Sequence, residues 1–333
     1  MANRISRSLE LVCPAGTPAS LKAAVTAGAD AVYCGFADET NARNFPGLNF
    51  SAAEIAAGIK HAHAHGARVF VAINTYPQAG REAVWREAVD TAATLGADAV
   101  ILADIGLLNY ATEKHPGLRR HLSVQAAASS AEAIGFFARE FGVKRVVLPR
   151  VLTVEEIERL NAATGVETEV FVFGGLCVMA EGRCALSSYA TGQSPNMNGV
   201  CSPACAVRYE QDGDTMLSHL GAFAIDSFPA GQPTGYPTLC KGRYRVRGEP
   251  IYLFEEPTSL GALAILPRLK AAGVAAVKIE GRQRGKAYVA EVVSRFRQAI
   301  DALDRGGSAT ADTLGHLAEG GRQTTGAYHR RWR

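Results

Sequence analysis

The sequence predicts an α/β fold, a TIM-type (β/α)8 barrel that carries a cysteine-rich insertion after its seventh strand and a short C-terminal extension. Three observations predict this fold. Short apolar runs alternate with helical patterns in units of roughly 20 to 35 residues. Eight such runs occur, and most are apolar along much of their length, as strands buried on both faces are. No GxGxxG motif follows the first run, which disfavours a dinucleotide-binding sheet.

The barrel elements are expected in a regular order along the chain. Strands are predicted at residues 9–12, 30–35, 68–74, 98–103, 121–125, 145–148, 167–173 and 275–280. Helices are predicted near residues 19–27, from 52 onward, and near 81–95, 106–113, 130–141, 153–163, 259–272 and 286–304. Thr17 is a suitable N-cap for the first helix, and Ser51 with Glu54 has the pattern of a capping box at the second.

This order divides the chain into four parts. Residues 1–176 carry the first seven strands, 177–254 form the cysteine-rich insertion, 255–304 complete the barrel and 305–333 form the C-terminal extension. Polar and apolar residues alternate over 240–254 on both sides of Arg247-Gly248, which predicts a β-hairpin there. Because the insertion follows the end of a barrel strand, it emerges at the rim where the active sites of such barrels lie.

Composition limits the class of protein. The 333-residue chain is 47% hydrophobic and 20% charged, with a formal net charge of +3. This excludes a disordered or collagen-like chain, and the net charge is too small to predict a nucleic-acid or membrane surface by itself. No apolar run reaches the length of a membrane span, and no apolar stretch typical of a secretory signal follows Arg7. We therefore expect a cytoplasmic protein of enzyme size.

Five of the seven cysteines fall within the insertion. Cys177, Cys184, Cys201 and Cys240 have the spacing C-x6-C-x16-C-x38-C, and Cys205 follows the third of them after three residues. Four thiolates are the ligand set of an iron-sulfur cluster or of a structural zinc. Structural zinc sites usually draw their cysteines from close pairs, and no C-x2-C occurs here, so an iron-sulfur cluster is favoured. Spacing alone leaves open whether Cys201 or Cys205 is the third ligand.

Charged side chains are expected at the same rim. Arg43 follows the second strand, and Glu280 and Arg282 end the eighth, so the three project near the insertion. An arginine fork suits a carboxylate ligand, whereas a salt bridge of Glu280 with Arg43 or Arg282 is an equal alternative. Weaker candidates, which have only their position at strand ends, are Asn74, Asp104, Gln125 and Arg150.

Two other groups of residues receive no function. Cys13 and Cys34 end the first two strands and are expected as buried core thiols. His61, His63 and His65 lie two residues apart on a predicted outer helix, where at most the first and third share a face. Neither a GxSxG elbow nor an HExxH helix is present, so the familiar hydrolase arrangements have no support.

The segment FGGLCVMAEGRCALSSY at 173–189 resembles the signature of the collagenase-like peptidase family, U32, although Glu181 stands where the signature has serine. The similarity covers nearly the whole chain. The longer motifs resemble the UbiU/UbiV group of ubiquinone-biosynthesis hydroxylases; among them are GADAVYCG (28–35), DETNAR (38–43), VVLPRVL (146–152), GYPTLCKGRY (235–244), VKIEGRQR (277–284) and TTGAYHRRW (324–332).

The resemblance implies a [4Fe-4S] cluster on Cys177, Cys184, Cys201 and Cys240. It also implies a UbiV-like homologous subunit as heterodimeric partner, prephenate as oxygen donor, and O2-independent hydroxylation of the aromatic ring of ubiquinone precursors, with a lipid-carrier protein as a candidate for delivering them. Peptidase activity is not expected. For the two carboxylates of the donor, the candidates are Arg43, Arg150 and Arg282.

Two competing functions remain. Related family members hydroxylate bases of tRNA or rRNA with the same donor, and such a substrate needs a basic groove and salt-dependent binding. The net charge leaves this alternative open, as do four arginines of the tail, Arg322, Arg330, Arg331 and Arg333. A metal-stabilised binding module without catalysis is the third class, and it predicts zinc in place of iron.

Overall fold

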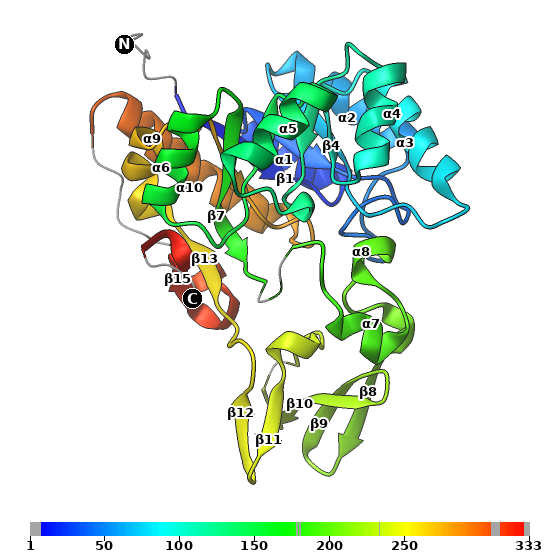
Figure 1. Cartoon of the computed structure of the whole chain (residues 1–333). Helices are drawn as coiled ribbons and strands as arrows, with labels where there is room; N and C mark the ends of the chain where they lie inside the picture. The colour runs from blue at the N-terminus through cyan, green and yellow to red at the C-terminus, as the bar shows by residue number, and fades with distance from the viewer. Residues whose placement is uncertain (1–7, 178, 180, 233, 308–313, 330–333) are drawn as a thin grey trace.

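Eight parallel strands form a closed barrel, as the sequence predicts. The computed structural model describes residues 8–177, 179, 181–232, 234–307 and 314–329 (Figure 1). Each barrel strand pairs with its neighbours in chain order, and the last strand pairs with both the first and the seventh, which closes the ring. The barrel strands are β1 (Glu10–Pro14), β2 (Ala31–Cys34), β3 (Arg68–Ile73), β4 (Ala99–Leu102), β5 (Arg120–Leu122), β6 (Arg145–Val147), β7 (Glu167–Gly175) and β14 (Ala276–Ile279).

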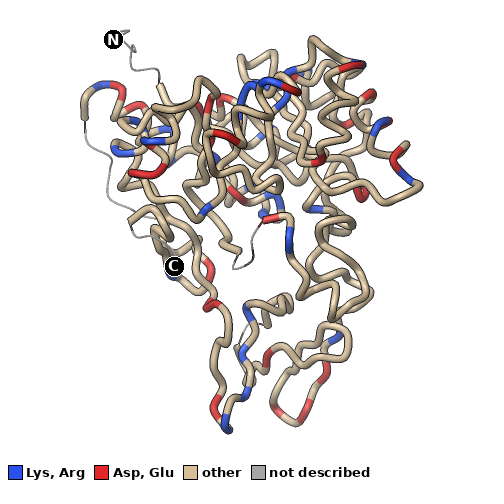
Figure 2. Tube along the Cα trace, viewed as in Figure 1, with Lys and Arg blue, Asp and Glu red and all other residues tan. Residues whose placement is uncertain are grey.

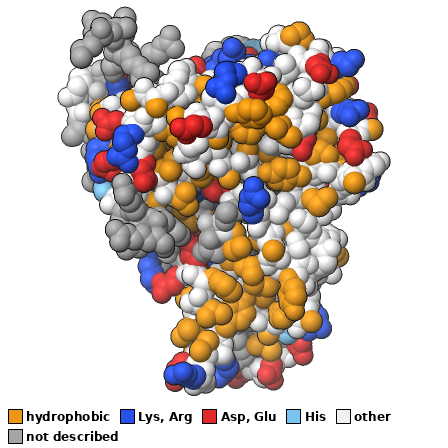
Figure 3. Space-filling model, in the orientation of Figure 1, with side chains coloured by type: hydrophobic (Ala, Val, Ile, Leu, Met, Phe, Trp, Pro, Cys, Tyr) orange, Lys and Arg blue, Asp and Glu red, His pale blue; other side chains and the backbone are white. Residues whose placement is uncertain are grey.

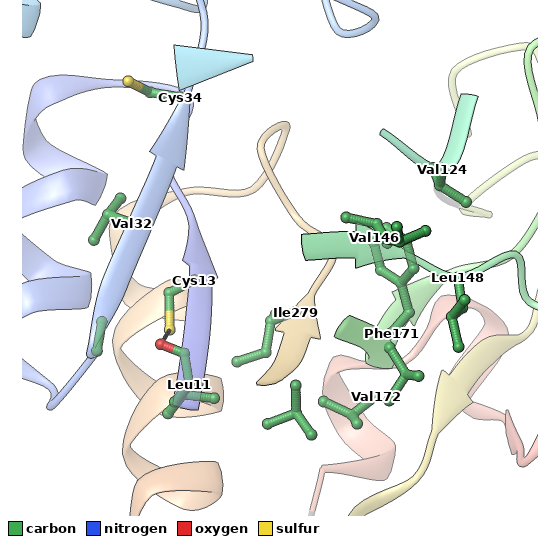
Figure 4. Packing of buried hydrophobic residues seen from close by; sticks show 14 of the residues in the cluster. Leu11, Cys13, Val32, Cys34, Val124, Val146, Leu148, Phe171, Val172 and Ile279 are labelled. Carbon is green, nitrogen blue, oxygen red and sulfur yellow. Dashed lines mark hydrogen bonds between the residues drawn. The ribbon is translucent and has the colours of Figure 1, made fainter. Parts of the chain in front are cut away.

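Helices surround this barrel and bury their apolar faces on the strands. They are α1 (Pro18–Thr26), α2 (Ala52–Ala64), α3 (Glu82–Thr94), α4 (Ile105–Lys114), α5 (Ala131–Phe141), α6 (Val154–Ala163), α9 (Leu266–Ala271) and α10 (Lys286–Asp304). Thr17 caps α1, and Ser51 with Glu54 forms the predicted capping box on α2. The predicted core thiols are confirmed, since Cys13 and Cys34 are fully buried among the aliphatic side chains of the strands (Figure 4).

Two predicted elements differ in the structure. The helix predicted over 259–272 begins with the strand β13 (Ser259–Gly261), and α9 starts only at Leu266. β13 pairs antiparallel with the end of β7, which extends beyond the strands beside it and offers free backbone groups. The fifth strand ends at Leu122, and a 3-10 turn (Val124–Ala126) follows it.

The segment between β7 and β13 forms a separate lobe below the barrel in Figure 1. It contains two short helices, a three-stranded antiparallel sheet and a two-stranded hairpin. They are α7 (Leu186–Thr191), α8 (Pro195–Asn198), β8 (Val207–Asp212), β9 (Thr215–Leu220), β10 (Phe223–Pro229), β11 (Arg243–Val246) and β12 (Glu249–Tyr252). The hairpin predicted around Arg247-Gly248 is confirmed, and both turn residues have positive φ, as a tight hairpin turn requires. The three-stranded sheet is not among the predicted elements.

The C-terminal extension packs on the barrel beside β13. β15 (Gln323–Thr324) pairs parallel with β13, and the Tyr328 hydroxyl donates to the Phe171 carbonyl. Three of the four tail arginines named above, Arg330, Arg331 and Arg333, lie outside the described residues. None of the helices in the described part of the chain has both the length and the apolar character that crossing a membrane requires.

Candidate functional site

A cavity of about 260 Å³ lies where the carboxyl ends of the barrel strands meet the lower lobe. Its wall includes side chains that follow β2, β3, β5, β6, β7 and β14, together with residues of the lobe. The predicted candidates that line it are Cys177, Cys184, Cys201, Cys240, Arg43, Arg150, Glu280, Arg282, Asn74 and Gln125. Residues far apart in the chain therefore converge at the barrel rim, as the position of the insertion predicts.

Four cysteines share this cavity, and the fifth cysteine of the lobe does not line it. Cys201 interacts electrostatically with Cys177 and Cys184, and Cys240 interacts with Cys177 and Cys201. Cys205 is exposed and is not part of the cavity wall. Burial and the neighbouring thiols raise the pKa of Cys240 to about 12, because each thiolate repels the next. A positively charged metal group would reverse this repulsion.

The cysteines do not form the compact cage of a single ion. Within the described residues, no three histidine, cysteine, aspartate or glutamate side chains converge closely enough to hold one metal ion. A single zinc requires its sulfur ligands at about 2.3 Å from one point.

Local backbone geometry sets the position of each cysteine loop. Gly182 has φ +73°, and a Cβ there would lie 2.2 Å from the Gln125 carbonyl oxygen, so the loop between Cys177 and Cys184 rests directly on the barrel rim. The Asn196 side chain bonds both backbone groups of Cys184, accepting from its N–H at 3.3 Å and donating to its carbonyl at 3.1 Å. These contacts attach the first two cysteines to the barrel and to α8.

The other two cysteines are attached in the same way. Gly199, two residues before Cys201, lies against the barrel loop, since a Cβ there would be 2.1 Å from the Asn41 carbonyl oxygen. The Cys240 carbonyl accepts from the Glu255 N–H at 3.2 Å, which joins the two ends of the hairpin segment at the cavity wall. All four cysteine positions therefore depend on backbone contacts that fix their loops.

The charged residues on the barrel side form a partly paired wall. Arg43 Nε donates to Glu280 Oε1 at 3.2 Å, which is the salt bridge predicted as the alternative to a substrate role. Burial raises the pKa of Glu280, but Arg43 and Arg150 outweigh it and hold that pKa below its usual value. Arg282 does not pair with Glu280; it donates to Asn41 Oδ1 at 3.1 Å.

Arg282 and Arg150 are the two most enclosed arginines of this wall. Burial lowers the pKa of Arg282 to about 10. Arg150 is one-tenth exposed, donates from Nη1 to Glu181 Oε1 at 2.8 Å and stacks 3.7 Å from the centre of the Phe171 ring. Its buried Nε has no hydrogen-bond partner within the described structure. Arg150 therefore lines the cavity and keeps one buried N–H without a partner, although its position at a strand end placed it among the weaker candidates.

Lys278 is a residue of the cavity wall that sequence reasoning missed. Its Nζ donates to Glu169 Oε1 at 2.7 Å and lies 3.7 Å from the centre of the Tyr33 ring. Burial lowers the pKa of Lys278, although Glu169 opposes this effect. The available signal was a lysine in the middle of a strand that is otherwise apolar, because such a side chain is buried only with a partner.

Two weaker candidates have structural roles. Asp104 accepts from the Leu107 N–H at 2.8 Å and caps α4, and it is not part of the cavity wall. Asn74 accepts from the Ala42 N–H at 3.0 Å and holds the loop after β2. Gln125 lines the cavity, and its buried Oε1 has no partner in the described part of the chain.

Comparison with known proteins identifies related sequences. The family model for Peptidase family U32 matches residues 16–330. The chain is 32% identical to "tRNA hydroxylation protein P" of Escherichia coli (strain K12), over 94% of this chain and 73% of that protein. It is 31% identical to "23S rRNA 5-hydroxycytidine C2501 synthase" of the same organism, over 92% of this chain and 42% of that protein. A solved U32 peptidase structure, Mk0906, has a TM-score of 0.42 at 18% identity and covers 52% of this chain and 72% of its own.

Proposed function

We propose, given that the chain belongs to the peptidase U32 family, that it is the iron-sulfur subunit of a hydroxylase that modifies the aromatic ring of ubiquinone precursors without O2. Prephenate is the proposed oxygen donor and a UbiV-like homologous subunit the proposed partner. One observation carries the proposal: the four cysteines with the predicted ligand spacing all line one cavity at the barrel rim. Relatives named as hydroxylation proteins support the reaction class.

The proposed cofactor is a [4Fe-4S] cluster held by Cys177, Cys184, Cys201 and Cys240. The charges of the wall fit a group that is negative overall, because the lining has five cationic side chains and three carboxylates. These are Arg43, Arg150, Lys241, Lys278 and Arg282, with Glu181, Glu280 and Glu319. When bound, such a cluster supplies one-electron redox chemistry, since four thiolate ligands leave no open iron site.

The chain's own residues would bind and orient the oxygen donor. Arg150 and Arg282 both line the cavity, and Arg282 is held in place by Asn41 at 3.1 Å. Glu280 keeps Arg43 in the wall through the 3.2 Å salt bridge. A donor with two carboxylates would therefore bind against the barrel side of the cavity, where these arginines lie. Peptidase activity is not proposed, because no histidine lines the cavity among the described residues.

The surface beside the cavity favours a ring that carries an apolar tail. Exposed apolar side chains gather on the lower lobe (Figure 3), among them Tyr189 (85% exposed), Leu253 (54%) and Tyr236 (49%). Contiguous exposed apolar patches often mark surfaces that bind a ligand, a membrane or another protein. Phosphate groups of RNA would instead require a continuous basic groove.

Hydroxylation of a base in tRNA or rRNA with the same donor is the second candidate. The names of the curated relatives favour it, since two of them refer to tRNA and rRNA hydroxylation. Exposed aromatic side chains such as Tyr189 also stack on unpaired bases in many RNA-binding proteins.

One experiment separates the two candidates. The anaerobically purified protein, with a UbiV-like subunit from the same source, is given prephenate and either a polyprenylated phenol or unmodified tRNA and rRNA transcripts. Mass spectrometry then follows the added oxygen. The proposal predicts hydroxylated phenol and unchanged RNA. Hydroxylated RNA with unchanged phenol would replace it by the second candidate.

A further inference from the structure

Of the described residues of the C-terminal extension, Glu319 alone lines the cavity. Its backbone is fixed on the barrel sheet, because the Glu319 N–H donates to Ser259 Oγ at 2.9 Å. Gly320 follows with φ +60°, and a Cβ there would lie 2.6 Å from the Pro257 carbonyl oxygen, so the extension rests directly on the chain before β13. The Glu319 carboxylate therefore reaches the cavity from a turn whose backbone is held in place.

The Glu319 carboxylate joins the lobe to the barrel. Lys241 Nζ pairs with Glu319 Oε2, and Arg284 Nη2 donates to Glu319 Oε1 at 3.2 Å. Acidic and basic positions both occur where the extension, the barrel rim and the lobe approach one another (Figure 2). The Lys241 side chain is 16% exposed and that of Arg284 is 41% exposed. Because water and salt screen an exposed pair more than an enclosed one, the pair with Lys241 is the stronger of the two.

The first and the fourth cysteine of the cavity both lie next to a residue that this carboxylate contacts. Lys241 directly follows Cys240 in the chain. On the other side, a Cβ on Gly175 would lie 3.4 Å from Glu319 Oε1, and Gly175 ends β7 two residues before Cys177. Cys240 and Cys177 are themselves close enough to interact electrostatically. One carboxylate therefore connects the two cysteines of the set that are farthest apart in the sequence.

We infer that Glu319 is a positioning residue for the cluster, because its ion pair with Lys241 keeps Cys240 beside Cys177. Cys240 lies in a short 3-10 turn (Leu239–Lys241), and the bond of its carbonyl with the Glu255 N–H stays within the lobe. The pair of Lys241 with Glu319 instead connects this turn to the extension and, through it, to the barrel. This positioning role rests on the proposed function, since it concerns the group that the four cysteines would bind. Residues that hold metal ligands in place change metal affinity by about 10- to 100-fold when they are substituted.

Iron release to a ferrous-iron chelator tests this role on the anaerobically purified protein. Glu319→Ala should release iron about tenfold faster than the parent or more. Lys241→Met should do the same, and the double variant should be no faster than either single variant, because one ion pair carries the effect. Glu256→Ala is the matched control: it breaks the exposed pair of Glu256 with Arg322 of the same extension, outside the cavity wall, and should release iron as the parent does. A merely structural loss would instead be additive in the double variant.

A thiol cross-link separates the positioning role from the cluster itself. In the full chain with the other three cysteines of the lobe changed to serine, a short bismaleimide can join Cys177 to Cys240, since the two core thiols are buried. Glu319→Ala should reduce the cross-linked fraction, measured by peptide mass spectrometry, whether or not iron binds. A parent without iron whose cross-link depends on Glu319 would refute the cluster and preserve the positioning role. The role is overturned if the cross-linked fraction does not depend on Glu319, or if an iron-containing parent and its Glu319→Ala variant release iron equally fast.

Discussion

The buried pair of Lys278 and Glu169 provides a quantitative test of the barrel interior. Their side chains are 5% and 1% exposed, and 2.7 Å separates Nζ from Oε1. Lys278→Met leaves the Glu169 carboxylate with one remaining cationic partner, Arg145, at 3.2 Å. Breaking a buried ion pair costs about 3 to 5 kcal/mol, and the remaining arginine places this loss at the lower end. We expect the free energy of unfolding to fall by about 3 kcal/mol.

Urea unfolding followed by circular dichroism measures this loss. Lys270→Met is the matched control, because Lys270 pairs with Asp304 at 2.7 Å in a more exposed setting, and its removal should cost less than about 1 kcal/mol. The double variant Lys278→Met with Glu169→Met should be no less stable than Lys278→Met alone, since no uncompensated charge remains. A loss below about 1 kcal/mol for Lys278→Met, or a double variant as unstable as the sum of the two single changes, would refute this reasoning.

Three further predictions concern pH, loop packing and donor binding. Burial raises the pKa of Glu10, but two arginines outweigh this effect and hold the pKa below 4.5. The stability that the Glu10 carboxylate contributes is therefore present above about pH 4.5 and is lost as the pH falls below it. Glu10→Gln should flatten this acid dependence of the free energy of unfolding in urea titrations, and an unchanged pH dependence would contradict the prediction. Gly182→Ala should lower the iron content, because the new Cβ would lie 2.2 Å from the Gln125 carbonyl oxygen and displace the cysteine loop. Gly192→Ala has the same φ of +73° but nothing within 4 Å, and it should keep its iron. Equal iron losses in the two variants would exclude the contact with Gln125 as the cause. Arg150→Ala removes a guanidinium from the cavity wall and should raise the KM for an anionic donor by about tenfold or more; an unchanged KM would remove Arg150 from the donor site.

The barrel was predictable because its strands and helices are encoded by local patterns. α10 occupies residues Lys286–Asp304, the range expected from its 3.6-residue period, and the turn at Arg247-Gly248 follows from local hairpin chemistry. β13 could not be predicted in this way. Its three residues are held by the end of β7 and by β15, segments that are distant in the chain.

The sequence predicts which residues reach the cavity only through their position at the ends of the barrel strands or in the insertion. Arg43, Glu280 and the cysteines follow strands or lie in the insertion, so the fold class brings them to one rim. Which side chains pair with one another at that rim depends on side-chain geometry. The spacing of residues in the sequence does not reveal that Arg282 bonds to Asn41 rather than to Glu280. Lys278 was missed because its burial depends on Glu169, which lies on the neighbouring strand β7.

The central claim is that four cysteines at the barrel rim hold an iron-sulfur cluster. Anaerobic EPR and absorption spectra, with iron, sulfide and zinc contents per chain, test it on the parent protein and on five single cysteine-to-alanine variants. We expect four iron and four sulfide per chain in the parent. We expect both to be lost in the variants at Cys177, Cys184, Cys201 and Cys240, and to be retained in Cys205→Ala.

Two results would contradict this claim. One zinc per chain in the parent would show a structural metal site and would remove redox hydroxylation from the account. Loss of iron in Cys205→Ala with retention in Cys201→Ala would show that the ligand is the exposed thiol rather than the one that lines the cavity.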